Sequence, residues 1–404
     1  MKSIKEIYRI GLGPSSSHTM GPREAALRFL SRLSPSASSV QVTLYGSLAA
    51  TGKGHMTDVA IESVLRPTGL PFEILWEPEI FLPYHPNALR FKSFSQSGDL
   101  LDEMLVYSIG GGAIKIEGEE TDDLPDIYPM SHMTDIMHYC ENTGKSYWEY
   151  VEECEGPEIW DYLATVWAAM KNAVERGLAS EGRLPGPLNL SRKAAQYYIK
   201  AEAYRENMKS RGLTFAYALA VCEENASGGE IVTAPTCGSC GVVPGVLYHI
   251  WKSRDVPERR ILRALATAGL VGNVVKENAS ISGAEVGCQG EVGVACAMAA
   301  AAANQIFGGS PSQIEYAAEM GLEHHLGMTC DPVCGLVQIP CIERNAYAAA
   351  RALDANIYSA FSDGVHRVSF DKLVHVMKET GHDLPSLYKE TGAGGLAKDF
   401  NFSV

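Results

Sequence analysis

The stretch EGEETDDLPD, residues 117–126, separates two parts of the sequence that differ in character. Before it, short segments alternate apolar and polar side chains, which is typical of half-buried β-strands. After it, this alternation fades and amphipathic helical segments follow one another, several of them ending at glycine. The sequence therefore predicts an α+β protein, with an N-terminal α/β domain over residues 1–125 and an all-α domain over residues 130–404.

The expected strands of the first part are marked by alternation and by glycine. Val40, Val42 and Leu44 alternate with polar neighbours, and residues 89–92 repeat the pattern. In LVYSIGGGAIKIEG, residues 105–118, three glycines allow the chain to turn between two further strands. Residues 23–33 place apolar side chains on one face and predict a helix.

Composition limits the classes of function. The chain has 404 residues, of which 46% are hydrophobic, enough for sizeable buried cores. Its net charge of −14 argues against binding to nucleic acid or to an anionic membrane surface. The most apolar run, residues 292–303, is too short to cross a bilayer and predicts a buried helix. No signal peptide is recognisable at the start of the chain, and we expect a cytoplasmic protein.

Cysteines gather in the later half of the chain, where seven of the ten lie between residues 237 and 341. Ser310, Pro311 and Gln313 predict a helix that begins with a capping box and runs to about residue 327. Cys330 then falls in the loop after this helix. The next helix is expected to begin at Pro340, with Cys341 in its first turn. Cys288 lies in a glycine-rich approach to the alanine-rich helix.

Three explanations for these cysteines are open from the pattern alone. Reduced cysteines serve as small core residues. A helix N-terminus lowers the pKa of a thiol, and thiolates bind metal ions. Cys237 and Cys240 form a CxxC pair, which occurs in redox and zinc sites. The intervals between Cys288, Cys330 and Cys341 match neither a zinc finger nor a bacterial ferredoxin.

Polar residues of the first part offer a second cluster of reactive groups. His18, His55 and His85 each lie in an irregular segment rich in glycine or proline, where a histidine is either a surface or capping residue or a general base. Hydroxyl and free N–H groups before a helix suit a carboxylate, although one serine is enough for an N-cap. Three consecutive serines favour substrate binding at this point: Ser15, Ser16 and Ser17.

Five segments together resemble the bacterial iron–sulfur L-serine dehydratases (L-serine ammonia-lyases). They are GPSSSHTMGP (13–22), YGSLAATGKGHMTD (45–58), TAPTCGSCGVVPGV (233–246), SGAEVGCQGEVG (282–293) and TCDPVCGLVQIPCIERNA (329–346). The resemblance implies a [4Fe–4S] cluster held by only three cysteines, Cys288, Cys330 and Cys341. One iron then keeps an open position and acts as a Lewis acid on the hydroxyl group of L-serine. Cys237, Cys240, Cys296 and Cys334 become neighbouring or packing residues.

The resemblance also implies roles for residues of the first part. His55 is expected to be the base that removes the Cα proton, and His18 and His85 to position the substrate or move a proton. The substrate-binding residues are expected to include the three serines, Thr57 and Asn87. The products are pyruvate and ammonia, and the protein is expected to be a homodimer.

Four alternatives stay open. A related iron–sulfur lyase acts on L-threonine or L-cysteine, and an amino-acid sensor keeps the cluster without turnover. A structural zinc protein uses the same cysteines, and a pyridoxal-phosphate dehydratase needs a lysine such as Lys53. The chain also departs from the family: only 29 residues separate His55 from His85, and no cysteine follows Cys341. We therefore expect no cysteine of the tail to cap the open iron.

Overall fold

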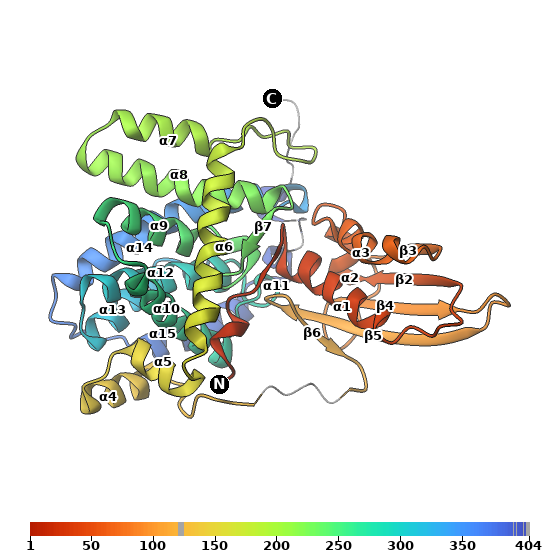
Figure 1. Cartoon of the computed structure of the whole chain (residues 1–404), viewed down its shortest axis with the longest axis horizontal. Helices are drawn as coiled ribbons and strands as arrows, with labels where there is room; N and C mark the ends of the chain where they lie inside the picture. The colour runs from red at the N-terminus through yellow and green to blue at the C-terminus, as the bar shows by residue number, and fades with distance from the viewer. Residues whose placement is uncertain (120–124, 391, 393, 399, 401–404) are drawn as a thin grey trace.

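The computed structural model describes residues 1–119, 125–390, 392, 394–398 and 400, and it consists of a sheet part beside a larger helical part (Figure 1). The expected α+β class is confirmed. The middle of the dividing stretch, residues 120–124, lies outside the described residues.

The sheet part is built on five strands in the order β3-β2-β4-β5-β6. β2 runs parallel to β3, and the other neighbours are antiparallel. The alternation in the sequence is real, because every second residue of β2 is buried. The glycines at 110–112 turn the chain between β5 and β6, as expected. The strands are β2 (Ser39–Tyr45), β3 (Phe72–Glu77), β4 (Asn87–Phe94), β5 (Leu100–Gly110) and β6 (Ala113–Ile116).

Helices cover one face of this sheet. α1 (Gly21–Leu30) and α3 (Thr57–Leu65) pack their apolar sides against β2, β4 and β5, and together they form a core around Phe29, Ile61 and Phe91. The short α2 (Gly46–Thr51) follows β2 directly. The segment between α2 and α3 carries His55, so the core of the sheet part fixes this histidine from both sides.

The helical part surrounds one alanine-rich helix. α12 is buried along nearly its whole length, as expected for residues 292–303, and lies among α9, α10, α13 and α14 (Figure 1). Its small side chains allow close approach: a Cβ on Gly321 of α13 would lie 2.9 Å from the Ala297 Cα. The helices are α4 (Met133–Thr143), α5 (Tyr147–Glu155), α6 (Ile159–Ala179), α7 (Ala194–Ala203), α8 (Glu206–Ala226), α9 (Val242–Arg254), α10 (Glu258–Asn278), α11 (Gly283–Val286), α12 (Val294–Phe307), α13 (Pro311–Glu323), α14 (Cys341–Ala360) and α15 (Phe370–Asp383).

The capping box at the start of α13 is confirmed, since Ser310 and Gln313 bond reciprocally to each other's backbone. The helix ends at Glu323, a few residues earlier than expected. Just beyond this end, the Nδ1 atoms of two histidines approach carbonyl groups of the last turn: His324 contacts Met320 O at 3.0 Å and His325 contacts Gly321 O at 2.7 Å. No helix of the described residues is long and apolar enough to span a membrane.

Two features differ from the expected division of the chain. The helical part contains a short strand, β7 (Glu230–Val232), so the expectation of a purely helical second part is wrong in this detail. Its partner is β1 (Ile10–Leu12) near the N-terminus, which pairs antiparallel with it. Ile4, Ile7 and Tyr8 are also buried in the core of the helical part. The chain thus starts in the helical part and crosses into the sheet part after residue 12.

Candidate functional site

The first crossing forms a tight, buried turn that carries one candidate histidine. Residues Ser16–Met20 make a single π-helical turn, η2, that leads into α1. Ser15 caps the turn, with its hydroxyl accepting a hydrogen bond of 3.1 Å from the His18 backbone N–H. Ser17 Oγ lies 2.9 Å from His18 Nδ1, and Ser47 Oγ lies 3.1 Å from His18 Nε2. Both ring nitrogens of His18 are therefore held by hydroxyl groups.

The fold brings the second and third histidines beside the first. The rings of His18 and His55 are 4.5 Å apart between centroids. Thr19 Oγ1 donates to His55 O at 2.7 Å, and Thr57 Oγ1 donates to His18 O at 2.6 Å, so the two loops hold each other. His85 lies near enough to His18 to affect its charge, and its Nδ1 accepts a hydrogen bond of 3.1 Å from the Asn87 backbone.

This histidine group contains buried polar atoms that have no partner. Both ring nitrogens of His55, Nε2 of His85 and both amide atoms of Asn87 are buried without a hydrogen bond among the described residues. Buried polar atoms are nearly always paired, because an unpaired one costs free energy. Five such atoms on three neighbouring residues indicate a place that is completed by a polar ligand.

The three imidazoles are neutral at neutral pH. Burial lowers the pKa of His55 to about 4. Burial also lowers the pKa of His18 well below its usual value, and a positive charge on His55 would lower it further. The pKa of His85 is lowered by burial and raised in part by Glu285. A neutral imidazole with a free ring nitrogen is able to accept a proton.

The candidate thiols come from three different elements and meet in the helical part. Cys288 precedes the π-helical turn η5 (Gln289–Gly293), Cys330 lies in the loop after α13, and Cys341 is the first residue of α14. The expected local positions of Cys330 and Cys341 are confirmed. All three side chains are buried, and they are close enough to influence one another's ionisation.

Burial acts on the pKa of these thiols in the direction opposite to that expected of a helix N-terminus. Burial raises the pKa of the Cys288 thiol to about 12, with a further contribution from the carboxyl group of Glu291. The pKa values of Cys330 and Cys341 are raised well above the usual value, first by burial and then by neighbouring thiols and Glu291. Desolvation is the largest contribution to the raised pKa of each of the three thiols. Arg344, which bonds to Cys288, opposes the change.

The residues at this place fit a group that carries positive charge. Three buried thiols beside one another ionise only when a cation compensates them, which is the situation of metal-bound cysteine. No three His, Cys, Asp or Glu side chains of the described residues converge closely enough to hold a single metal ion. A four-iron cluster spreads its thiolates over separate iron atoms and so spaces them more widely.

The candidate site also contains two glutamates that were not predicted from the sequence. Glu291 accepts hydrogen bonds from Thr236 Oγ1 at 2.8 Å and from Cys330 Sγ at 3.8 Å. Glu390 places Oε1 3.9 Å from His18 Nδ1, while its backbone N–H donates to Cys330 O at 2.8 Å. Glu390 thus joins the histidine group to the cysteines, and burial raises its pKa to about 8. Glu390 has a left-handed backbone conformation, φ 57°, which cannot be predicted from its residue type.

Glycines bring the two parts of the molecule into contact beside this site. A Cβ on Gly54 would lie 3.2 Å from Cys334 O and 3.3 Å from Gly335 O. Gly335, at φ 66°, lies in turn against Thr51. The histidine loop of the sheet part and the cysteine loop of the helical part therefore touch backbone to backbone, which a larger side chain would prevent.

The remaining candidates take other places. Cys237, Cys240 and Cys296 are buried free thiols, and Cys334 is exposed. Cys237 Sγ lies 3.7 Å from Met20 Sδ rather than near a second metal-binding pair. Lys53, the lysine considered for a pyridoxal-phosphate site, lies over the ring of Trp76 at 5.6 Å. The Thr57 hydroxyl is engaged with the His18 backbone, which supports a positioning role for it.

Comparisons with known proteins show the family of the chain. The family model described as serine dehydratase alpha chain matches residues 103–397, and the one described as serine dehydratase beta chain matches residues 3–70 and 67–119. The two ranges matched by the beta-chain model meet at residues 67–70, between His55 and His85. L-serine dehydratase TdcG of Escherichia coli is 42% identical over 98% of this chain and 99% of its own length. The L-serine dehydratases of Streptomyces coelicolor and Haemophilus influenzae are 41% and 40% identical, each over 98% of this chain and over 98% and 99% of their own lengths.

Proposed function

Because this chain belongs to the serine dehydratase family, we propose that it is a lyase that converts L-serine to pyruvate and ammonia. The observation that carries the proposal is the group of unpartnered polar atoms on His55, His85 and Asn87 beside three buried thiols. A ligand with carboxylate, ammonium and hydroxyl groups satisfies such atoms.

We assign binding of the substrate to Ser15, to the turn η2 that follows it and to the start of β4. The His18 N–H of η2 already donates to Ser15 Oγ, whereas the N–H groups of Ser16 and Ser17 at the start of the turn suit a carboxylate. The hydroxyls of Ser15, Ser16 and Ser17 are buried around this point. The amide group of Asn87, at the start of β4, offers both a donor and an acceptor to the substrate.

We assign removal of the Cα proton to His55. Its imidazole is neutral and both ring nitrogens lack partners, so it can accept a proton without first breaking a hydrogen bond. His18 is held by the hydroxyls of Ser17 and Ser47 and is better placed to orient the substrate or move a proton. His85 keeps Nε2 free for the same ligand.

Cys288, Cys330 and Cys341 are the residues that would hold the [4Fe–4S] cluster. When bound, the cluster supplies an iron with an open position that acts as a Lewis acid towards the departing hydroxyl group. Loss of the Cα proton and of hydroxide leaves aminoacrylate, which tautomerises to an imine and is hydrolysed to pyruvate and ammonia. Exclusion of bulk water around the buried histidines favours the elimination.

The substrate is tested by comparing three amino acids under oxygen-free conditions. Purified protein is given L-serine, L-threonine or L-cysteine, and ammonia and the 2-oxo acid are measured together. We expect equal amounts of ammonia and pyruvate from L-serine at the highest kcat/KM. Turnover of threonine or cysteine alone would favour the related lyase, and no turnover of any of the three would favour the sensor. His55→Asn protein is the matched control for background release.

A further inference from the structure

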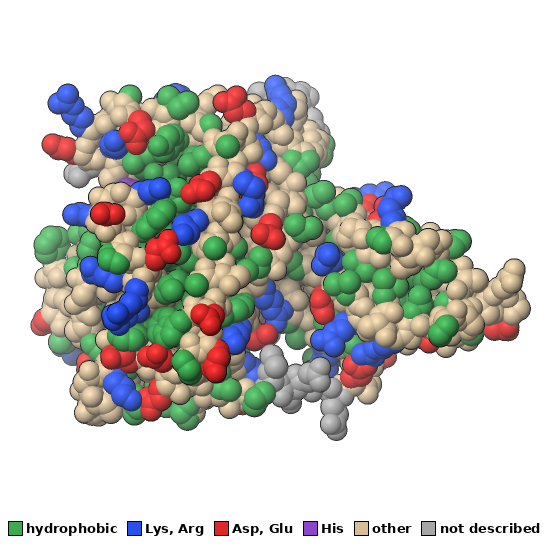
Figure 2. All heavy atoms as spheres, viewed as in Figure 1, with side chains coloured by type: hydrophobic (Ala, Val, Ile, Leu, Met, Phe, Trp, Pro, Cys, Tyr) green, Lys and Arg blue, Asp and Glu red, His purple; other side chains and the backbone are tan. Residues whose placement is uncertain are grey.

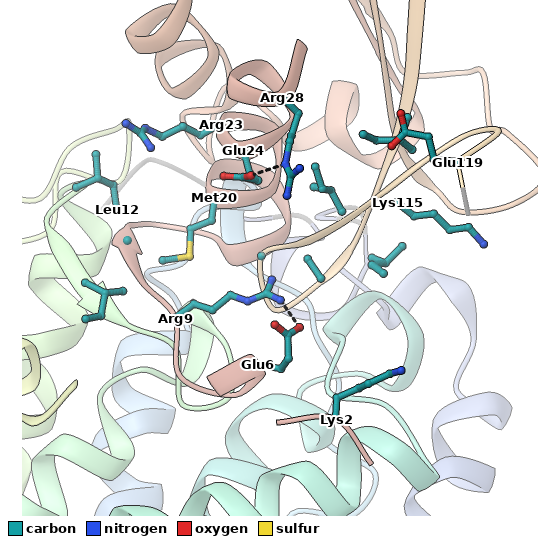
Figure 3. A pocket seen from close by; sticks show the side chains of 17 residues that line it. Lys2, Glu6, Arg9, Leu12, Met20, Arg23, Glu24, Arg28, Lys115 and Glu119 are labelled. Carbon is teal, nitrogen blue, oxygen red and sulfur yellow. Dashed lines mark hydrogen bonds and ion pairs between the residues drawn. The ribbon is translucent and has the colours of Figure 1, made fainter. Parts of the chain in front are cut away.

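A pocket of about 570 Å³ opens at the junction of the two parts, and no candidate histidine or cysteine is among the residues that line it. Its walls come from the N-terminal segment, from α1 and from the hairpin of β5 and β6 (Figure 3). The volume is in the range of small-molecule sites. The pocket therefore spans both parts of the molecule, because the N-terminal segment packs with the helical core and α1 packs on the sheet.

Basic side chains outnumber acidic ones in the lining of this pocket, although the chain as a whole is acidic and one of the basic residues, Lys2, pairs with Asp126. The lining holds five basic residues and three glutamates: Lys2, Arg9, Arg23, Arg28 and Lys115, with Glu6, Glu24 and Glu119. Each glutamate is already paired with an arginine: Glu6 with Arg9, Glu24 with Arg28 and Glu119 with Arg32. Figure 2 shows Lys and Arg side chains on both sides of the junction.

Two arginines have donors left for a ligand inside the pocket. Arg28 donates to Glu24 through Nε, and its terminal nitrogens make no hydrogen bond to the described residues, although Glu119 lies near enough to feel its charge. Arg9 uses its terminal nitrogens on Glu6 and on Gly111 O and keeps Nε. In Figure 3 the two guanidinium groups reach the middle of the pocket from opposite sides. Arginine is well suited to carboxylate and phosphate groups.

The rest of the lining is apolar. Ile10, Leu12 and Ile109 are among the exposed large hydrophobic side chains of the protein, and all three line the pocket. Met20, Ile114 and Ile116 extend this surface. Apolar walls beside arginines match a ligand with an acid group on an apolar body rather than a simple inorganic ion.

We propose that this junction pocket binds a small organic anion, in which a carboxylate or phosphate group is joined to an apolar body. The acid group lies between Arg9 and Arg28, and the apolar body contacts the isoleucines of β6 and the N-terminal segment. A ligand held this way bridges the helical part and the sheet part. Met20, which lines the pocket, ends the turn that carries His18, so binding bears directly on the position of that histidine.

Binding is measured by calorimetry on the oxygen-protected holoprotein without serine, so that the result does not depend on the proposed reaction. Phenyl phosphate carries a phosphate group and phenylacetate carries a carboxylate group, and each compound has one phenyl ring. Inorganic phosphate presents the charge alone, and benzyl alcohol presents the ring alone. We expect at least one aromatic acid to bind with a Kd on the order of 10–100 μM, about tenfold tighter than inorganic phosphate. Binding of only one acid identifies the acid group that the pocket prefers.

Arg28→Gln is the diagnostic variant and Arg66→Gln is its matched control. Both arginines pair with a glutamate four residues earlier on a helix of the sheet part, but Arg66 does not line the pocket. We expect Arg28→Gln to weaken binding about tenfold and Arg66→Gln to leave it unchanged. Binding that is equal in the two variants, or no binding of either aromatic acid below about 1 mM, would overturn the proposal.

Discussion

At the scale of single residues, His55 stands out because its ring is fully buried and neither nitrogen has a partner. A buried histidine of the core normally bonds through at least one nitrogen, as His249 does with Ser210 Oγ at 2.8 Å. A buried imidazole without partners is poorly explained by stability, since polar atoms buried without hydrogen bonds cost free energy. It is well explained by a base that waits for a substrate.

Replacing His55 by asparagine is expected to abolish most turnover while leaving the fold intact. General base catalysis contributes about a hundredfold to ten-thousandfold, so kcat should fall by at least about a hundredfold. The visible absorbance and iron content should not change, because His55 is not among the cluster ligands. His249→Asn is the control for loss of a buried histidine and should retain normal kcat. Equal kcat in His55→Asn and the parent protein would remove His55 as the base.

His55 also predicts how stability depends on pH. In the unfolded chain a histidine takes up a proton below about pH 6.5, whereas in the folded protein burial lowers the pKa of His55 to about 4. The unfolded state therefore binds more protons between these values, and the free energy of unfolding falls as the pH falls through this window. His249 and His325, each with a pKa lowered by burial to about 4, act in the same direction.

The measurement is the midpoint of thermal unfolding at about pH 7.5 and about pH 5, monitored by circular dichroism in the absence of oxygen. The midpoint of the parent protein should drop on acidification, and the drop should be smaller in His55→Asn. The exposed His375 has no such burial, so His375→Asn should behave as the parent does. A drop that is the same in His55→Asn and the parent would show that His55 does not titrate as described.

At the scale of elements, the sequence predicted individual helices and strands, but it did not predict which distant segments contact one another. The capping box at Ser310, the alternation in β2 and the start of α14 at Cys341 follow from neighbours within a few residues. The pairing of β1 with β7 and the return of Glu390 to His18 join segments more than two hundred residues apart, which no local period encodes. The histidines and cysteines could be named individually from the resemblance. Their burial, and the raised pKa values of the thiols, depend on the packed helical part.

The three elements that carry Cys288, Cys330 and Cys341 predict a simple pattern of cysteine variants. Replacing any of the three by serine should lower the iron content strongly, because each supplies one ligand of the proposed cluster. Cys334→Ser is the matched control, since Cys334 lies between two of them in the sequence but is exposed. It should keep the iron content of the parent. Loss of iron in Cys334→Ser, with iron retained in Cys288→Ser, would contradict the ligand assignment.

At the scale of the whole molecule, the candidate site lies where the chain crosses between its two parts. The sheet part supplies the histidines and the helical part supplies the cysteines, and Glu390 and the glycine contacts at Gly54 and Gly335 hold them together. Neither core contains the site alone. This division explains why chemistry-bearing residues occur near both ends of the sequence.

The predicted homodimer is tested by light scattering of the oxygen-protected protein. Several large apolar side chains are exposed at the end of α14 and just beyond it, including Tyr358, Phe361 and Val365, as expected for a surface that a second chain covers. The mass in solution should be about twice the 43.6 kDa of one chain. A mass equal to that of one chain at micromolar concentration would contradict this prediction.

The most direct test of the account is a count of iron and acid-labile sulfide on one oxygen-protected sample whose conversion of L-serine to pyruvate is followed at the same time. We predict about four iron and four sulfide per chain, and activity that declines together with the iron when air is admitted. Full conversion of serine by protein that contains no iron would contradict the assignment of Cys288, Cys330 and Cys341.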